Sequence, residues 1–143
     1  MQEVKETIKG AKNAIILSHV DPDGDAVGSM IAFYLALKAM GKKAVMCSAD
    51  PVPEIYKFLP ESGKIKADIN GGKYDLAIVL DCGDGKRVGK DVDLKSLAEI
   101  VINIDHHPDN TNFGDVNMVE PVSSVSEIIY RLFRKMRVKI TRR

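Results

Sequence analysis

The sequence predicts a single α/β domain with a mostly parallel central sheet flanked by helices. Short runs of consecutive apolar residues, typical of strands buried on both faces, alternate along the chain with helical patterns. Segments rich in Asp and His follow three of these runs, as expected for a site at the carboxyl ends of parallel strands. The 143 residues can build one hydrophobic core, and no linker or internal repeat divides them.

The first half of the chain predicts one strand–helix–strand unit. An amphipathic helix is expected over residues 2–10, followed by a buried strand at 14–18. Residues 27–40 carry apolar side chains on almost every side, which predicts a substantially buried helix ended by Gly41. A second strand is expected at 43–48.

The second half continues the alternation of strands and helices. The turn-rich segment that follows is expected to hold a short helical piece around residues 54–59. Residues 75–81 form the clearest central strand, and 100–104 form another fully apolar strand. A brief helix is expected at 94–98 and an edge strand at 116–119.

The last helix has a well-marked beginning. Ser124 and Glu127 have the spacing of a capping box, and apolar residues follow at helical intervals up to Met136. From Arg131 to Arg143 there are seven basic residues and no acidic one. We interpret these as charges suited to the carboxyl end of a helix; a nucleic-acid patch is the alternative.

The composition narrows the classes of function. A net charge of +1 gives no overall signal for nucleic-acid or membrane binding. No apolar run reaches the roughly 18 residues that cross a bilayer, and the first residues lack the pattern of a signal peptide, so we expect a cytoplasmic protein. Cys47 and Cys82 each follow a strand-like run, which predicts buried free thiols.

The stretch from His19 to Ser29 contains the strongest chemical signal. It places one imidazole and the carboxylates of Asp21, Asp23 and Asp25 within seven residues. Like charges repel at short range, and a divalent cation reverses that cost by binding carboxylate oxygen and imidazole nitrogen. Capping of a helix would explain only one carboxylate, with Asp25 as the candidate. A P-loop is excluded because its glycine and lysine pattern is absent.

Two further segments are expected to meet this stretch at the same edge of the sheet. Asp81 ends one predicted strand, although an Asp followed by Cys and Gly is often only a turn former. Asp105-His106-His107 ends another, so all three histidines of the chain lie beside or near an Asp at a strand end. The alternative for these histidines is a partly buried structural role. We favour a metal-dependent enzyme.

Taken together, these motifs resemble the DHH phosphoesterase superfamily, which includes RecJ-like exonucleases, nanoRNases and type II inorganic pyrophosphatases. The matching residues are His19-x-x-Pro22-Asp23-Gly24-Asp25-Ala26-x-Gly28-Ser29, Asp81 and Asp105-His106-His107. Phe58-Leu59-Pro60 and Arg87-x-Gly89 are most similar to the nanoRNase and 3′-phosphoadenosine 5′-phosphate phosphatase branch. The resemblance implies a Rossmann-like three-layer domain that hydrolyses phosphoester bonds of nucleotides or short single-stranded oligonucleotides. A binding module with little turnover and a pyrophosphatase are the alternatives.

The resemblance also implies two Mn²⁺-type ions, with Mg²⁺ or another divalent cation as the alternative. His19 and Asp23 would hold the first ion, Asp25 and His106 the second, and Asp81 would bridge both. A bridging carboxylate suits the roughly 3.5–4 Å separation of two-metal phosphoryl chemistry, in which a metal-activated water attacks phosphorus.

The same resemblance implies roles for three other residues. His107 would meet the substrate phosphate as a catalytic residue, and Arg87 would be a second substrate contact. Asp105 would orient a neighbouring imidazole.

The sequence departs from the family pattern after its last predicted helix. Family members carry a further metal-binding Asp at that point, and longer members add a C-terminal substrate domain with a Gly-Gly-His motif; neither follows here. We therefore expect residues 1–143 to be a DHH catalytic domain truncated before both features. The apolar residues left uncovered could drive formation of a homodimer.

Overall fold

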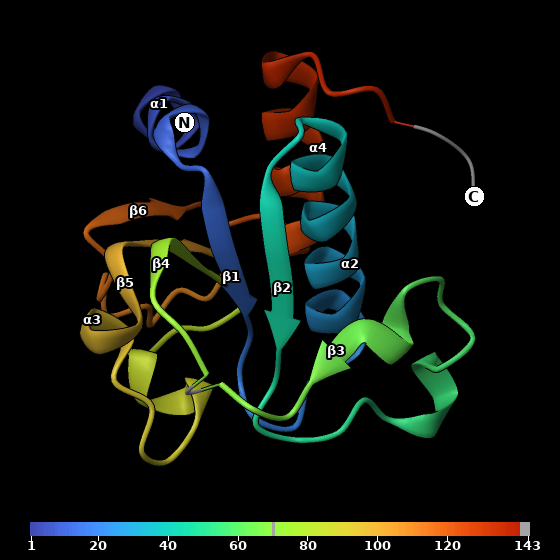
Figure 1. Cartoon of the computed structure of the whole chain (residues 1–143). Helices are drawn as coiled ribbons and strands as arrows, with labels where there is room; N and C mark the ends of the chain where they lie inside the picture. Colours follow the sequence, from blue (N-terminus) through green and yellow to red (C-terminus); the bar gives the residue numbers. More distant parts are fainter. Residues whose placement is uncertain (70, 141–143) are drawn as a thin grey trace.

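The computed structural model describes residues 1–69 and 71–140. Its centre is a six-stranded sheet in the order β3-β2-β1-β4-β5-β6, and every neighbouring pair is parallel (Figure 1). The strands are β1 Asn13–Leu17, β2 Lys43–Cys47, β3 Ile65–Lys66, β4 Tyr74–Leu80, β5 Ala98–Asp105 and β6 Val116–Val119. The α-helices are α1 Gln2–Gly10, α2 Gly24–Ala39, α3 Leu94–Leu97 and α4 Val125–Met136. The predicted α/β class with a parallel sheet is confirmed.

Helices cover both faces of the sheet, which makes the three layers that the family resemblance implied. Alternate residues of β4 point to opposite faces, so Ile78 packs with α1, α2 and α4, whereas Val79 packs with α3 and a 3₁₀ turn at Gly85–Val88. Because both faces are covered, the strands are mostly apolar in their central parts, with Asn103 of β5 as a buried polar residue.

The long helix α2 begins and ends at identifiable capping residues. Asp23 is its N-cap, and its Oδ1 accepts a hydrogen bond from the backbone of Ala26 at 3.0 Å. At the other end Gly41 adopts a φ of 74°, and the backbone N–H of Lys42 reaches back to Leu37. The helix therefore starts three residues before the predicted position and ends at Ala39, one residue before the predicted end and followed by Gly41.

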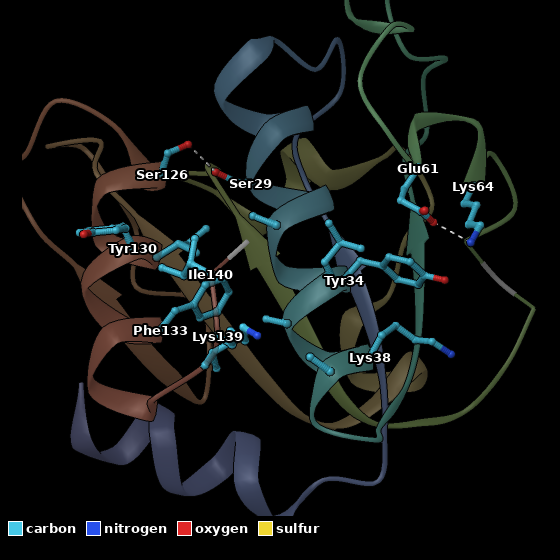
Figure 2. A pocket seen from close by; sticks show the side chains of 16 residues that line it. Ser29, Tyr34, Lys38, Glu61, Lys64, Ser126, Tyr130, Phe133, Lys139 and Ile140 are labelled. Atoms are coloured by element: carbon cyan, nitrogen blue, oxygen red, sulfur yellow. Dashed lines mark hydrogen bonds and ion pairs between the residues drawn. The ribbon is translucent and has the colours of Figure 1, made fainter. Parts of the chain in front are cut away.

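Helix α4 begins directly after Ser124, the predicted N-cap, and packs beside α2. The Ser124 hydroxyl accepts a hydrogen bond from the backbone of Glu127, and the rings of Phe33 and Phe133 meet edge to face at 5.1 Å. A cavity of about 670 Å³ lies between the two helices, and Figure 2 shows Tyr34 and Ile140 among its lining residues. Apolar side chains, among them Leu35 and Ile140, form much of the lining of this cavity.

Two of the basic residues of the last segment, Arg131 and Arg134, have structural partners. Arg131 forms an ion pair with Glu120 at 2.6 Å, and the Arg134 guanidinium lies over the ring of Tyr130. Arg142 and Arg143 lie outside the described residues. These contacts favour the structural interpretation of the basic residues over a nucleic-acid patch.

The prediction for the two cysteines was confirmed, and three elements were missed. Cys47 and Cys82 are buried free thiols. The two-residue strand β3 and the 3₁₀ turns at Ser62–Lys64 and Gly85–Val88 were not predicted from the sequence. Within residues 1–69 and 71–140, no helix is both long enough and apolar enough to cross a bilayer.

The order of the strands shows where a ligand site is expected. The chain leaves β1 for β2 on one side and later returns to place β4 on the other side of β1. The arrowheads of β1 and β2 point to the edge of the sheet away from α1 (Figure 1). In parallel sheets ligands bind beyond this edge where the strand order changes direction, here between the ends of β1 and β4.

Candidate active site

Asp81 is the centre of the candidate site. It follows β4 directly, is 2% exposed and adopts a left-handed φ of 56°. Its Oδ1 atom has no hydrogen-bond partner among the described residues. Burial, together with the nearby carboxylates of Asp25 and Asp23, raises the pKa of Asp81 from 3.8 to about 6. A buried carboxylate in this state is stabilised by a proton or by a cation.

Two imidazoles face Asp81 through the same ring nitrogen. His19 Nδ1 lies 2.6 Å from the carbonyl of Val20, and His106 Nδ1 lies 3.0 Å from the carbonyl of Val122. A carbonyl oxygen only accepts, so each Nδ1 atom carries a proton, and in the neutral imidazole the lone pair that can bind a metal is on Nε2. These Nε2 atoms lie 3.9 Å and 3.4 Å from the oxygens of Asp81. This is the arrangement of imidazoles that bind a metal.

The potential ligand atoms form two groups that share Asp81. In one group, atoms of His19, Asp23 and Asp81 lie within 4.8 Å of one another; the other group consists of Asp81, His106 and His107. A mixed set of imidazole nitrogen and carboxylate oxygen fits Mn²⁺ and similar divalent ions. The residues present therefore fit the implied cofactor, and Asp81 occupies the position between the two groups.

Asp25 belongs to neither group and is bound to the amino end of α4. Its Oδ2 accepts a hydrogen bond from the backbone of Val125 at 2.7 Å. Its Oδ1 accepts hydrogen bonds from the backbone and hydroxyl of Ser126. The structure thus brings His19, Asp23, Asp81 and His106 together but gives Asp25 other partners. It also shows that Asp23, not Asp25, is the cap of α2.

Asp105 holds His107 in place. The Asp105 carboxylate is fully buried; one oxygen lies 2.7 Å from His107 Nδ1, and the other accepts a hydrogen bond from Asn110 at 2.6 Å. The hydrogen bond to Asp105 raises the pKa of His107. His107 remains partly exposed, so its other nitrogen is accessible to a ligand.

Two asparagines that support this network were missed at the sequence level. Asn103 is fully buried in β5; its amide donates to the carbonyl of Cys82, and its oxygen accepts from Asn110. The predicted strand at 100–104 was described as fully apolar, which overlooked Asn103. A polar residue inside an otherwise apolar strand indicates a buried side chain that needs hydrogen-bond partners, and this signal was present in the sequence at Asn103.

Arg87 lies beside the site without a direct contact to its carboxylates. It is exposed in the Gly85–Val88 turn, and its backbone carbonyl accepts a hydrogen bond from Val20 at 2.7 Å. Its positive charge opposes protonation of His107, although the Asp105 hydrogen bond outweighs this effect on the pKa. Through this hydrogen bond the Gly85–Val88 turn, which was not predicted from the sequence, links the loop after β4 to the loop that bears His19.

Comparisons with known proteins agree with this geometry. The chain is 40% identical over 124 residues to the "Bifunctional oligoribonuclease and PAP phosphatase NrnA" of Thermus thermophilus, covering 85% of this chain and 36% of that protein. It is 32% identical over 133 residues to a "Probable manganese-dependent inorganic pyrophosphatase" of Streptococcus equi subsp. zooepidemicus, covering 88% of this chain and 42% of the relative.

A solved structure shares the fold. An exopolyphosphatase-related protein from Bacteroides fragilis superposes with a TM-score of 0.84 at 28% identity, covering 94% of this chain and 43% of that one. The chain thus spans less than half the length of each of these three proteins. The model of the DHH family, N-terminal domain, matches residues 13–143. The chain therefore belongs to the DHH family.

Proposed function

We propose that this chain is the catalytic domain of a metal-dependent phosphoesterase that acts on nucleotides or short single-stranded oligonucleotides. The observation that carries the proposal is the buried Asp81 carboxylate, which has an oxygen without a partner and faces the Nε2 atoms of two histidines. The name of the Thermus thermophilus relative, an oligoribonuclease and PAP phosphatase, supports this substrate class.

The chain offers ligands for two divalent ions. His19, Asp23 and Asp81 would hold one, and Asp81 and His106 would hold the other, with Asp25 as a further predicted ligand of the second. The manganese named for the Streptococcus equi relative and the mixed donor set both favour Mn²⁺. When bound, such ions lower the pKa of a water and offset charge on a phosphoryl group.

His107 would act on the substrate directly, and Asp105 would position it. Asp105 accepts a hydrogen bond from Nδ1, so Nε2 of His107 is the atom available to a phosphate oxygen. The raised pKa of His107 increases the protonated fraction, which donates from Nε2 to the negatively charged phosphate. Arg87, exposed on the neighbouring turn, is proposed as a second contact to the substrate.

The test is hydrolysis of a diribonucleotide and of 3′-phosphoadenosine 5′-phosphate with Mn²⁺, comparing the wild type with Asp81→Asn. Asn tolerates the left-handed backbone of position 81, so the fold is expected to persist. We expect at least a roughly 1,000-fold loss of rate, because both ligand groups lose their shared carboxylate. Glu3→Gln, an equal change of charge on the exposed face of α1, is the control and should leave the rate unchanged.

Two outcomes would contradict the proposal. Unchanged hydrolysis in Asp81→Asn would show that Asp81 is not at the centre of the reaction. Binding of Mn²⁺ and nucleotide by the wild type without any turnover would favour the alternative of a binding module.

Inorganic pyrophosphate is a second candidate substrate, because the chain is also similar to a protein named as a manganese-dependent inorganic pyrophosphatase. Rates for pyrophosphate and for a diribonucleotide, measured on the same preparation, would decide between them. We expect the dinucleotide to be preferred; a higher specificity constant for pyrophosphate would overturn that preference.

A further inference from the structure

A second cavity lies at the carboxyl ends of β2 and β3, beside the candidate active site. Its volume is about 410 Å³, within the range of small-ligand sites. It is lined by Ser48, Asp50, Pro51, Val52, Lys57, Ser62, Gly63, Ile65, Lys66 and Ala67. None of these residues belongs to the two candidate metal groups. We propose that this cavity binds a nucleobase of the substrate, an inference that rests on the proposed function.

The cavity is tied to the loop that carries the metal-binding residues. Asp50 lines the cavity, and its Oδ2 accepts a hydrogen bond from the backbone of Asp21 at 2.7 Å. Asp21 lies between His19 and Asp23 in that loop. The ring of Tyr56 also packs closely on Gly24, at the first residue of α2. The cavity therefore borders the loop that carries His19 and Asp23.

The position relative to the sheet supports the same assignment. The strand order changes direction between β1 and β4, and the cavity lies over the next strands on the β1 side. In doubly wound folds a nucleoside extends from the switch point toward the end of the second strand, where an acidic residue meets the ribose hydroxyls. Asp50, three residues after β2, has the corresponding place here.

The chemistry of the wall fits a base better than a bare phosphate. Pro51, Val52 and Ile65 supply apolar surface for the faces of a ring. Ser48 is 1% exposed, and its hydroxyl has no hydrogen-bond partner among the described residues, so it can donate to or accept from the polar edge of a base. The Asp50 carboxylate can accept a hydrogen bond from a base amine or a ribose hydroxyl, groups that a bare phosphate does not offer.

A lysine beside the cavity suits the charge of the linked phosphate. Lys66 lines the cavity at the end of β3 and is exposed. Its ammonium attracts a phosphate group joined to the bound nucleoside without needing a fixed geometry. The wall thus combines apolar faces, a hydroxyl, a carboxylate and a cation around one nucleotide-sized space.

The experiment compares binding of adenosine 5′-monophosphate and ribose 5-phosphate by calorimetry, because the two differ only in the base. The variant is Gly63→Leu: Gly63 lines the cavity and a Cβ there meets no atom within 4 Å, so the wall accepts a side chain without displacing the backbone. Gly10→Leu is the matched control, since Gly10 has equal free space at the end of α1.

We expect the wild type and Gly10→Leu to bind the nucleotide at least about tenfold more tightly than the sugar phosphate. Gly63→Leu should abolish that preference while leaving sugar-phosphate binding unchanged. A preference that persists in Gly63→Leu would overturn the proposal, as would equal affinities in the wild type. Hydrolysis measured in parallel keeps the two claims distinct: a base preference that persists in Gly63→Leu, together with normal turnover in the wild type, refutes only the cavity assignment, whereas a wild type without turnover contradicts only the proposed function.

A measurement on the wild type alone covers the case in which Gly63→Leu fails to fold. Adenosine 5′-monophosphate should shift the methyl NMR signals of Val52 and Ile65, which lie on the wall of the cavity. Shifts confined to other methyl groups would contradict the assignment.

Discussion

Asp81 and Asp25 are acidic residues of the same family motifs, yet the structure gives them opposite surroundings. Both oxygens of Asp25 accept hydrogen bonds from the first turn of α4. Asp81 is buried with one oxygen unpartnered and two imidazole nitrogens facing it. A carboxylate that the protein itself satisfies needs no cation, whereas an unsatisfied buried one is stabilised by a proton or a cation. Within one crowded stretch of sequence, Asp25 therefore binds the amino end of α4, whereas Asp23 both caps α2 and belongs to a candidate metal group.

The largest effect is expected from removing the imidazoles that face Asp81, because they are the proposed partners of Asp81 in binding metal. Changes to residues that only support metal ligands typically weaken metal binding roughly 10- to 100-fold. His19→Gln and His106→Gln should each weaken Mn²⁺ binding by more than this, because each removes a proposed ligand. Calorimetric titration measures the loss. A variant that binds as tightly as the wild type would show that its histidine is not a ligand.

The second prediction concerns the metal-free protein and the pKa of Asp81. Between about pH 4 and pH 6 folded Asp81 keeps a proton that the unfolded chain has released, so the free energy of unfolding falls as pH rises through this window and is then constant. Across this window the free energy of unfolding falls by at most about 3 kcal/mol. Urea unfolding in EDTA should show that Asp81→Asn is more stable than the wild type above pH 6. If the free energy of unfolding changed with pH in the same way for both proteins, this prediction would be wrong.

Removing the partner of His107 should have an effect of intermediate size. In Asp105→Asn the hydrogen-bonded carboxylate is lost, so the pKa of His107 falls toward its ordinary value. We expect a roughly 10- to 100-fold loss of rate and a shift of the basic limb of the pH–rate profile to lower pH. A rate loss with an unchanged profile would indicate a purely structural role for Asp105.

The smallest expected effect comes from Asp25→Ala, measured without metal. Loss of the acceptor at the amino end of α4 should lower stability by about 1–2 kcal/mol. Thermal unfolding in EDTA measures this, with Asp23→Ala, the cap of α2, for comparison. Unchanged stability in EDTA combined with lost Mn²⁺ binding would make Asp25 a ligand and break the contrast with Asp81.

Most of the fold could be predicted from the sequence because buried parallel strands leave continuous apolar runs. The runs that became β1, β4 and β5 were placed within about two residues. Strand β3 escaped because two residues make no pattern, and its pairing with β2 depends on the tertiary fold. The start of α2 was missed because Asp23 caps it from within the acidic stretch.

The site was harder to predict than the fold. Convergence of the β1, β4 and β5 ends follows from parallel topology, and the structure places His19, Asp81 and His106 together as expected. The partners of Asp25 lie about 100 residues further along the chain, so no local pattern reveals them. The Asn103–Asn110 contact likewise depends on how β5 and the following loop fold back on each other.

We propose Asp81 as the carboxylate that two divalent-ion sites share. Titration of the wild type and Asp81→Asn with Mn²⁺, followed by electron paramagnetic resonance of the free ion, tests it most directly. We predict that the wild type takes up Mn²⁺ and that Asp81→Asn loses this binding, whereas Glu3→Gln retains it. Equal uptake by the wild type and Asp81→Asn would contradict the claim.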